Sequence, residues 1–80
     1  MRAVKQFDFS KLRGRIVEKF GTLERFAEAG DHSKGWISNR MNNVVPWDAQ
    51  EIDEACEMLD ISPEEIPVYF FTPKVPQVEQ

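Results

Sequence analysis

Apolar residues recur at helical spacing through the middle of this chain. Leu23, Phe26 and Ala27 stand at i, i+3 and i+4, and Ile37 and Met41 stand four residues apart. Residues with this spacing lie on one face of a helix. The pattern predicts two short amphipathic helices, each with one side that is buried.

Local signals mark the ends of these two helices. Thr22 and Ser33 stand where a hydroxyl accepts a hydrogen bond from a first-turn amide, as N-caps do. Gly30 and Asp31 lie between the helices and favour a turn, because aspartate tolerates the left-handed conformation. The two helices are therefore expected to form an angled helix-turn-helix.

A further helix is predicted before this pair, from about Ser10 to Phe20. Asp8 is the expected cap, Phe7 and Leu12 suit a hydrophobic staple across it, and Gly21 ends the helix.

Two more helices are predicted after the pair. Asp48 and Glu51 have the spacing of a reciprocal capping arrangement, with Trp47 placed to pack on Ile52. The same order of residue types recurs at 61–66, where a proline takes the first helical position. We interpret both helices as scaffold.

Length and composition predict one small domain. We assign residues 1–71 to it, with residues 1–7 as a flexible arm, and residues 72–80 to an extended or disordered tail because prolines stand at 73 and 76. Hydrophobic residues make up 41% of the chain, but no long apolar run predicts a membrane span or a signal peptide. We expect a cytoplasmic protein.

Charge is divided unevenly along the chain. Residues 1–45 hold nine Lys and Arg against five Asp and Glu, whereas residues 46–80 hold one Lys against nine Asp and Glu. The predicted helix-turn-helix lies in the basic half. An acidic back face either orients the domain on nucleic acid or is a solvated face that maintains solubility.

Few residues are available for catalysis or metal binding. Cys56 is the one cysteine and His32 the one histidine, so neither a disulfide nor a structural metal site is expected, and no cofactor is implied. His32 beside Asp31, with Cys56 or Ser33 as nucleophile, lacks a third orienting group. The chain is therefore not expected to be an enzyme.

The helix-turn-helix resembles that of the Cro/phage-repressor (XRE-type) superfamily, and the wider chain resembles short phage proteins labelled Cro-type. The resemblance is carried by residues 7–16, 22–42, 45–47, 51–52, 55–59, 61–66 and 69–71. It implies an all-α bundle of about five helices with a Cro/phage-repressor-like helix-turn-helix that binds operator DNA, commonly as a dimer. It also implies a nucleoid-associated protein in the cytoplasm of a bacterial host cell.

The chain departs from that family pattern at the turn. Gly30 and His32 remove aliphatic volume from the helix junction, and Asp31 stands where such proteins have a turn glycine. Lost core volume is destabilising unless another side chain fills the gap. Trp36, where the family has a small polar residue, is a candidate filler.

Helical geometry places polar residues of the second helix opposite its apolar side. The candidate DNA-binding residues are Ser33, Lys34, Gly35, Trp36, Asn39, Arg40, Asn42 and Asn43. An amide such as that of Asn39 fits an adenine edge, and Lys34 and Arg40 are suited to phosphate or guanine.

The other candidates have two interpretations each. Gly35 either lets the helix backbone approach DNA or is a neutral substitution, and Trp36 either packs at the junction or contacts DNA. Asn42 and Asn43 end the helix or donate to phosphate. Ser33 is chiefly an N-cap, whose helix terminus can also receive phosphate.

The sequence thus predicts a sequence-specific regulator of transcription that binds double-stranded operator DNA, a phage or prophage Cro-like repressor. A homodimer is expected at least on DNA, with no membrane and no small-molecule ligand as partner. The alternative is a protein-interaction module, antirepressor or antitoxin-like, whose acidic half binds a partner and whose helix-turn-helix is vestigial. For the C-terminal segment Tyr69–Val75, dimer contact and packing of Phe70 or Phe71 on the core both remain open.

Overall fold

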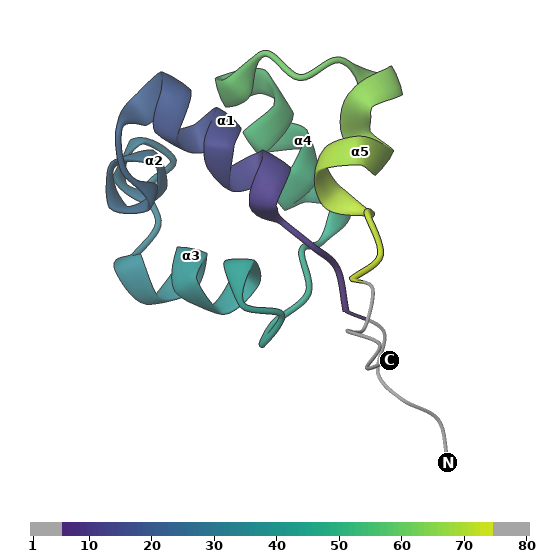
Figure 1. Cartoon of the computed structure of the whole chain (residues 1–80). Coiled ribbons are helices and arrows are strands. Elements are labelled where there is room, and N and C mark those ends of the chain that lie inside the picture. Colours follow the sequence, from purple (N-terminus) through teal and green to yellow (C-terminus); the bar gives the residue numbers. More distant parts are fainter. Residues whose placement is uncertain (1–5, 75–80) are drawn as a thin grey trace.

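The computed structural model describes residues 6–74, which form a bundle of five α-helices with one short 3₁₀ helix (Figure 1). In chain order these are α1 (Ser10–Phe20), α2 (Leu23–Ala29), α3 (Lys34–Met41), α4 (Ala49–Leu59), η1 (Pro63–Glu65) and α5 (Ile66–Phe70). The predicted all-α fold with a helix-turn-helix is confirmed.

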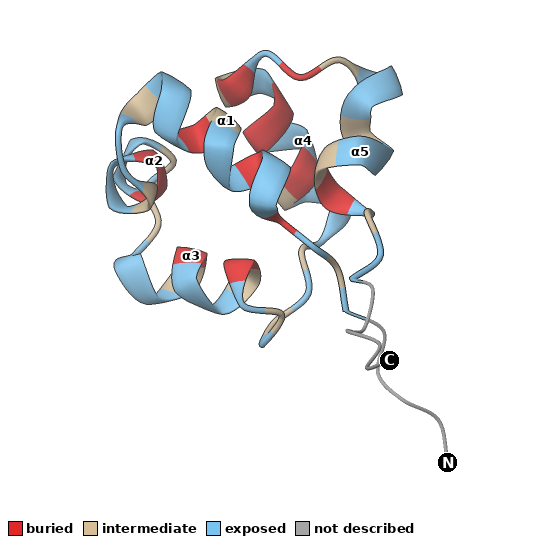
Figure 2. Ribbon diagram, in the orientation of Figure 1, coloured by how far each residue is buried: buried red, intermediate tan, exposed pale blue. Residues whose placement is uncertain are grey.

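Helix α1 crosses the middle of the bundle, with α2 and α3 on one side and α4 and α5 on the other (Figure 1). All five α-helices contribute buried residues (Figure 2). Leu12 and Ile16 of α1, Ile37 of α3, Leu59 of α4 and Phe70 of α5 are the largest fully buried ones. Helix α3 is thus held to the bundle by its apolar side, and its opposite side faces outward.

The caps and turn of the helix-turn-helix are as predicted. The Thr22 hydroxyl accepts from the Arg25 amide at 3.0 Å, and the Ser33 hydroxyl accepts from the Trp36 amide at 3.1 Å. Asp31 has φ 67°, the left-handed conformation that a short polar side chain tolerates. The departure from a turn glycine therefore leaves the turn intact.

The start of α1 differs from the prediction. The cap position is Phe9, which makes no side-chain cap bond, and Asp8 lies one residue earlier. The Asp8 carboxylate instead accepts from the Ser10 amide at 2.9 Å and the Ser10 hydroxyl at 2.6 Å. Phe7 packs on Phe9 and Phe71. Phe7 thus makes an aromatic contact to the C-terminal segment, and the staple with Leu12 stays a prediction.

Helix α4 begins with the predicted reciprocal cap. The Asp48 carboxylate accepts from the Glu51 amide at 2.7 Å, and the Glu51 carboxylate accepts from the Asp48 amide at 3.1 Å. Ser62 and Glu65 form the same arrangement before η1. Both capping motifs were local in sequence, and both formed.

The two ends of the described segment lie together. The Asp8 amide donates to the Thr72 carbonyl at 2.8 Å, and the Lys74 amide donates to the Gln6 carbonyl at 3.0 Å. Phe70 is buried, whereas Phe71 is 46% exposed. Residues 1–5 of the predicted arm and residues 75–80 of the predicted tail, with Val75, lie outside the described residues.

Candidate functional site

The outward side of α3 carries small, uncharged residues. Gly35, Ser38, Asn39 and Asn42 are exposed. A Cβ added to Gly35 would approach only the Ser33 hydroxyl, at 3.9 Å. The Asn42 side chain donates to the Ser38 carbonyl at 2.8 Å, while the Asn39 side chain forms no hydrogen bond with the described residues. This surface offers amides, a hydroxyl and open backbone, but no charge.

Lys34, in the first turn of α3, forms an ion pair inside the chain. Its Nζ lies 3.3 Å from Oε2 of Glu24 in α2. Both side chains are well exposed, so water screens the attraction and the pair contributes little to stability. The pair nevertheless places a carboxylate beside the cation that would otherwise attract phosphate.

Arg40, in the last turn of α3, is held much more firmly by Glu51 of α4. Its Nε donates to Oε1 at 3.2 Å and its Nη2 donates to Oε2 at 2.9 Å. The indole Nε1 of Trp36 donates to the same Oε2 at 3.1 Å, and the guanidinium lies 5.0 Å from the Trp36 ring centre. The Arg40 and Glu51 side chains are only 16% and 14% exposed. Both carboxylate oxygens are therefore occupied, and the guanidinium is turned away from the outward side of α3.

The ionisation of Glu51 follows from these contacts. Burial alone would raise the pKa of its carboxyl. Hydrogen bonds from Arg40, from the Asp48 amide and from Trp36, with the charge of Arg40, outweigh burial and lower the pKa below its ordinary value of 4.5. Glu51 is consequently a fixed negative charge between α3 and α4.

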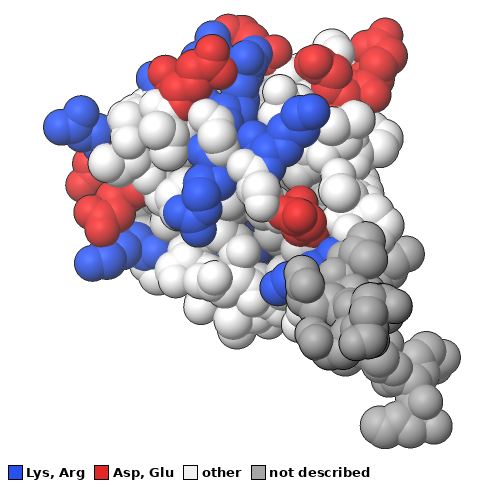
Figure 3. Space-filling view, in the orientation of Figure 1, with Lys and Arg blue, Asp and Glu red and all other residues white. Residues whose placement is uncertain are grey.

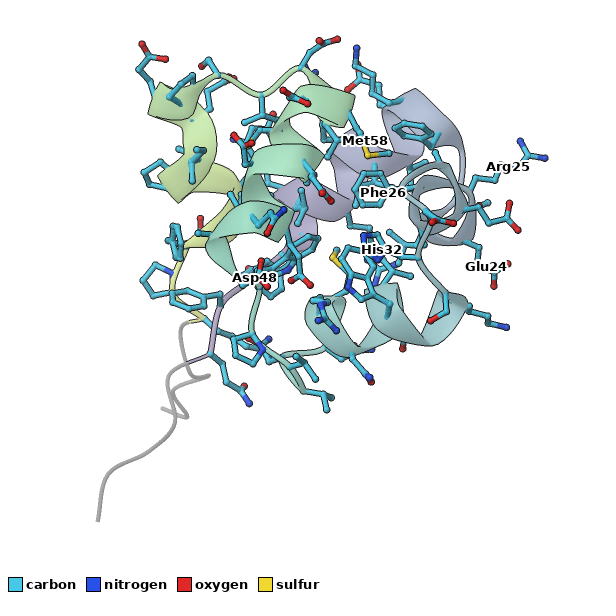
Figure 4. All side chains as sticks on the ribbon, turned by 180° about the vertical axis from the view of Figure 1, so that it is seen from behind. Glu24, Arg25, Phe26, His32, Asp48 and Met58 are labelled. Atoms are coloured by element: carbon cyan, nitrogen blue, oxygen red, sulfur yellow. The ribbon has the colours of Figure 1, made fainter. Side chains whose placement is uncertain are left out.

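Trp36 fills the junction that Gly30 and His32 leave short of aliphatic volume. The imidazole of His32 stacks on the Trp36 ring with centroids 3.7 Å apart. Trp47 contacts the Trp36 ring edge-on, with centroids 5.5 Å apart. His32 lies beside Phe26 and Met58, between the turn and α4 (Figure 4). Its Nε2 is 3.8 Å from a Glu54 oxygen. The interpretation of Trp36 as a packing residue is the one that the structure shows.

The side chains of Asn43 and Ser33 form hydrogen bonds with backbone groups of the same chain. Asn43 has φ 62°, the left-handed conformation expected after the helix, and its side chain bonds both backbone groups of Phe7: Oδ1 accepts from the amide and Nδ2 donates to the carbonyl, each at 3.0 Å. This links the α3 end to the segment before α1. The Ser33 hydroxyl is used by its cap bond.

The basic half of the chain does not present all its positive charge. Lys and Arg side chains spread over the middle of the face that carries α1 (Figure 3). Within residues 6–74, four cations of this half form ion pairs with carboxylates: Arg15 with Glu18, Lys19 with Asp60, Lys34 with Glu24 and Arg40 with Glu51. Two of these carboxylates, Glu51 and Asp60, come from the acidic half.

The acidic half retains unpaired charge on α4. Asp53 and Glu57 are exposed and form no ion pair with any described residue. Ile52, Ala55 and Leu59 are buried on the opposite side of the helix. Helix α4 therefore presents carboxylates to solvent on one side while its other side packs in the core.

Cys56 is the remaining candidate for chemistry, and it lies in the core. Cys56 is buried, and burial, together with the charge of Asp53, raises the pKa of its thiol. A thiol with a raised pKa is a poor nucleophile. The described residues contain no group of three possible metal ligands and no helix able to span a membrane.

Sequence reasoning missed the second role of Glu51. Its spacing from Asp48 identified a cap, and that cap exists. Nothing in the local pattern showed that the same carboxylate also accepts from Arg40 and Trp36, because these residues belong to a different helix.

A comparison with protein families matches residues 5–73 to the family described as Protein of unknown function (DUF739). The chain belongs to this family. No curated protein matches the chain.

The fold and sequence are also similar to a solved structure, the solution structure of the modulator of repression (MOR) of the temperate bacteriophage TP901-1 from Lactococcus lactis. The two are 42% identical, the match covers 81% of this chain and 88% of that one, and the TM-score is 0.75.

These matches correct the sequence prediction. The resemblance to the Cro-type and XRE-type repressors is wrong as a family assignment, and the prediction of a Cro-like DNA-binding repressor is overturned by the relationship to a modulator of repression. DNA binding, repressor activity and dimer formation are not supported. The pairing of Lys34 and Arg40 with the chain's own carboxylates gives a physical reason. Contacts of individual α3 residues with DNA stay predictions, as do operator DNA and a second copy as partners.

Proposed function

We propose that this protein modulates repression by binding a repressor protein. The observation that carries the proposal is the reduced positive charge of α3: Arg40 is held by the shielded Glu51, and Glu24 lies beside the exposed Lys34. A helix that reads DNA normally supplies positive charge to phosphates, and that charge dominates affinity. A small, neutral, amide-bearing helix face suits the close approach of another protein.

The relationship to MOR supports the same function. At 42% identity over most of both chains, the two proteins share more than a fold. That relative is described as a modulator of repression, which matches the interaction module that the sequence left as an alternative.

The charge of α4 indicates the kind of partner. Its unpaired carboxylates Asp53 and Glu57 face solvent in a half of the chain that holds nine acidic residues and one Lys. A DNA-binding protein presents a basic surface to phosphate. Acidic side chains of α4 are complementary to such a surface and compete with DNA for it.

The direct experiment uses the repressor encoded by the same genetic element. The repressor is titrated onto its operator, with and without this protein, and operator occupancy is followed by fluorescence anisotropy. We expect the protein to bind the repressor and to reduce its apparent operator affinity. A repressor that neither binds the protein nor changes its operator affinity would exclude the proposal.

A charge-matched pair of variants then tests the role of α4. Asp53→Asn with Glu57→Gln removes two exposed charges from the acidic half, and we expect affinity for the repressor to fall on the order of tenfold. Glu28→Gln with Asp31→Asn removes two exposed charges from the basic half, neither of which forms an ion pair with a described residue, and should leave affinity nearly unchanged. Equal losses in both variants would mean that net charge, and not α4, attracts the partner.

The proposal places the protein in the cytoplasm, where a repressor acts, and assigns it no catalytic activity. The stacked ring of His32 and the buried thiol of Cys56 support the second statement, since both groups are engaged in packing.

A further inference from the structure

We infer that Glu51 determines which partners α3 accepts, by holding the Arg40 guanidinium away from anionic groups. This goes beyond the proposed function and does not depend on which protein is bound. Glu51 thereby acts as an internal substitute for a phosphate, and it excludes nucleic acid as a partner of a helix-turn-helix whose backbone is otherwise suited to DNA.

Both oxygens of the Glu51 carboxylate accept hydrogen bonds. Oε1 accepts from Arg40 Nε and the Asp48 amide, and Oε2 accepts from Arg40 Nη2 and Trp36 Nε1. A two-point contact of this kind is also how arginine binds phosphate. The Nε–Nη2 edge of the Arg40 guanidinium, which could bind a phosphate at two points, is thus already used.

Arg40 lies in the last turn of α3. It follows directly after Asn39, whose exposed side chain belongs to the outward side of the helix. Arg40 also lines a groove of about 260 Å³ beside Val44 and Pro46, where the chain leaves α3. A guanidinium freed from Glu51 therefore has space in this groove, at the end of α3.

Two kinds of contact hold the Arg40 side chain: hydrogen bonds to Glu51 and the Trp36 ring. Charge-assisted hydrogen bonds to a shielded carboxylate are stronger than the contact of a cation with an aromatic ring at a partly exposed site. The Trp36 ring alone is therefore the weaker restraint on Arg40, and Glu51 is the principal one.

The experiment measures the binding of a short random-sequence duplex at low salt by fluorescence anisotropy. Glu51→Ala should bind at least about tenfold more tightly than the matched control Glu57→Ala, which removes the same charge from the same helix without freeing a cation. The salt dependence of log affinity should steepen by about 0.9 for one added phosphate contact. No gain over the control overturns the inference.

A double variant assigns the gain to Arg40. Glu51→Ala combined with Arg40→Gln has the net charge of the unaltered protein and should return to the duplex affinity of the unaltered protein. If the gain persists in the double variant, another group has caused it and the inference is wrong. In either case the repressor-binding experiment is unaffected, so failure of this inference and failure of the proposed function are separate results.

Two further measurements guard against misfolding. Glu51→Gln retains a residue that serves in a capping box, so it preserves the start of α4 and should show a smaller gain of the same kind. In the unaltered protein, NMR should show the Arg40 Nε–H exchanging with water more slowly than that of Arg13, which is exposed. Equal exchange rates would show that Glu51 does not hold Arg40 in solution.

Discussion

Helices α3 and α4 meet through Trp36, Arg40 and Glu51, yet they differ in how much charge they present. Both cations of α3 are paired with carboxylates of the same chain. On α4, Asp53 and Glu57 remain exposed without an ion pair among the described residues. The outward side of α3 thus shows mainly uncharged residues, whereas a helix predicted as scaffold shows unpaired charge.

Helices α3 and α4 show that the arrangement of the backbone does not determine the charge of the surface. The turn, the caps and the inward-facing Ile37 of α3 are those of a helix-turn-helix. Affinity for DNA depends in addition on free positive charge, and here Glu51 holds Arg40 while Glu24 lies beside the exposed Lys34. We therefore expect binding to depend on the charged residues that form no ion pair within the chain. Three predictions test the comparison of the two helices.

The largest effect is expected at the inward side of α3. Ile37 is 1% exposed, so Ile37→Ala should lower the free energy of unfolding by about 2–5 kcal/mol. Urea denaturation measures the loss. Asn39→Ala, on the outward side, should stay within about 0.5 kcal/mol of the unaltered protein. A comparable loss at Asn39 would show that the two sides of α3 are assigned incorrectly.

A smaller effect is expected from the ion pairs of α3. Arg40→Ala leaves the shielded Glu51 carboxylate without its main partner and should cost about 1–3 kcal/mol of unfolding free energy. Lys34→Ala breaks an exposed pair and should cost less than about 1 kcal/mol. The same denaturation series measures both. Similar losses in the two variants would remove the distinction between a firmly held and a screened cation.

The smallest effect is a dependence on pH. Because the folded protein lowers the pKa of Glu51, its stabilising contribution is fully present above the ordinary value of 4.5 and is lost as pH falls through the lowered value. Unfolding free energy measured from pH 5.5 to about pH 3 should therefore fall less steeply for Glu51→Gln than for the unaltered protein. Glu57→Gln should retain the original slope, and an identical slope in all three would contradict the assignment.

Much of the fold could be predicted because its signals are local. Thr22, Ser33, Asp48 and Glu51 each cap a helix through a partner three residues away, and the helix boundaries followed from those caps and from apolar spacing. The Asp8 cap was misplaced by one residue, since Asp8 satisfies the Ser10 amide and hydroxyl while Phe9 takes the cap position.

The chemistry of the site could not be predicted in the same way, because it depends on contacts between residues far apart in the chain. The pairing of Arg40 with Glu51 joins two helices, and the Asn43 side chain bonds Phe7 thirty-six residues away. The wheel geometry of α3 gave Asn39 an outward position correctly, but no periodicity reveals which charges are cancelled across a junction.

The short pairing of residues 6–8 with residues 72–74 has a practical consequence for protein engineering. Neighbouring backbone segments paired in this way lie about 4.8 Å apart, so the described fold begins and ends at nearly the same point. A host protein could accept it within an exposed loop without stretching that loop. Such an insertion would couple binding of a partner by this domain to a signal from its host.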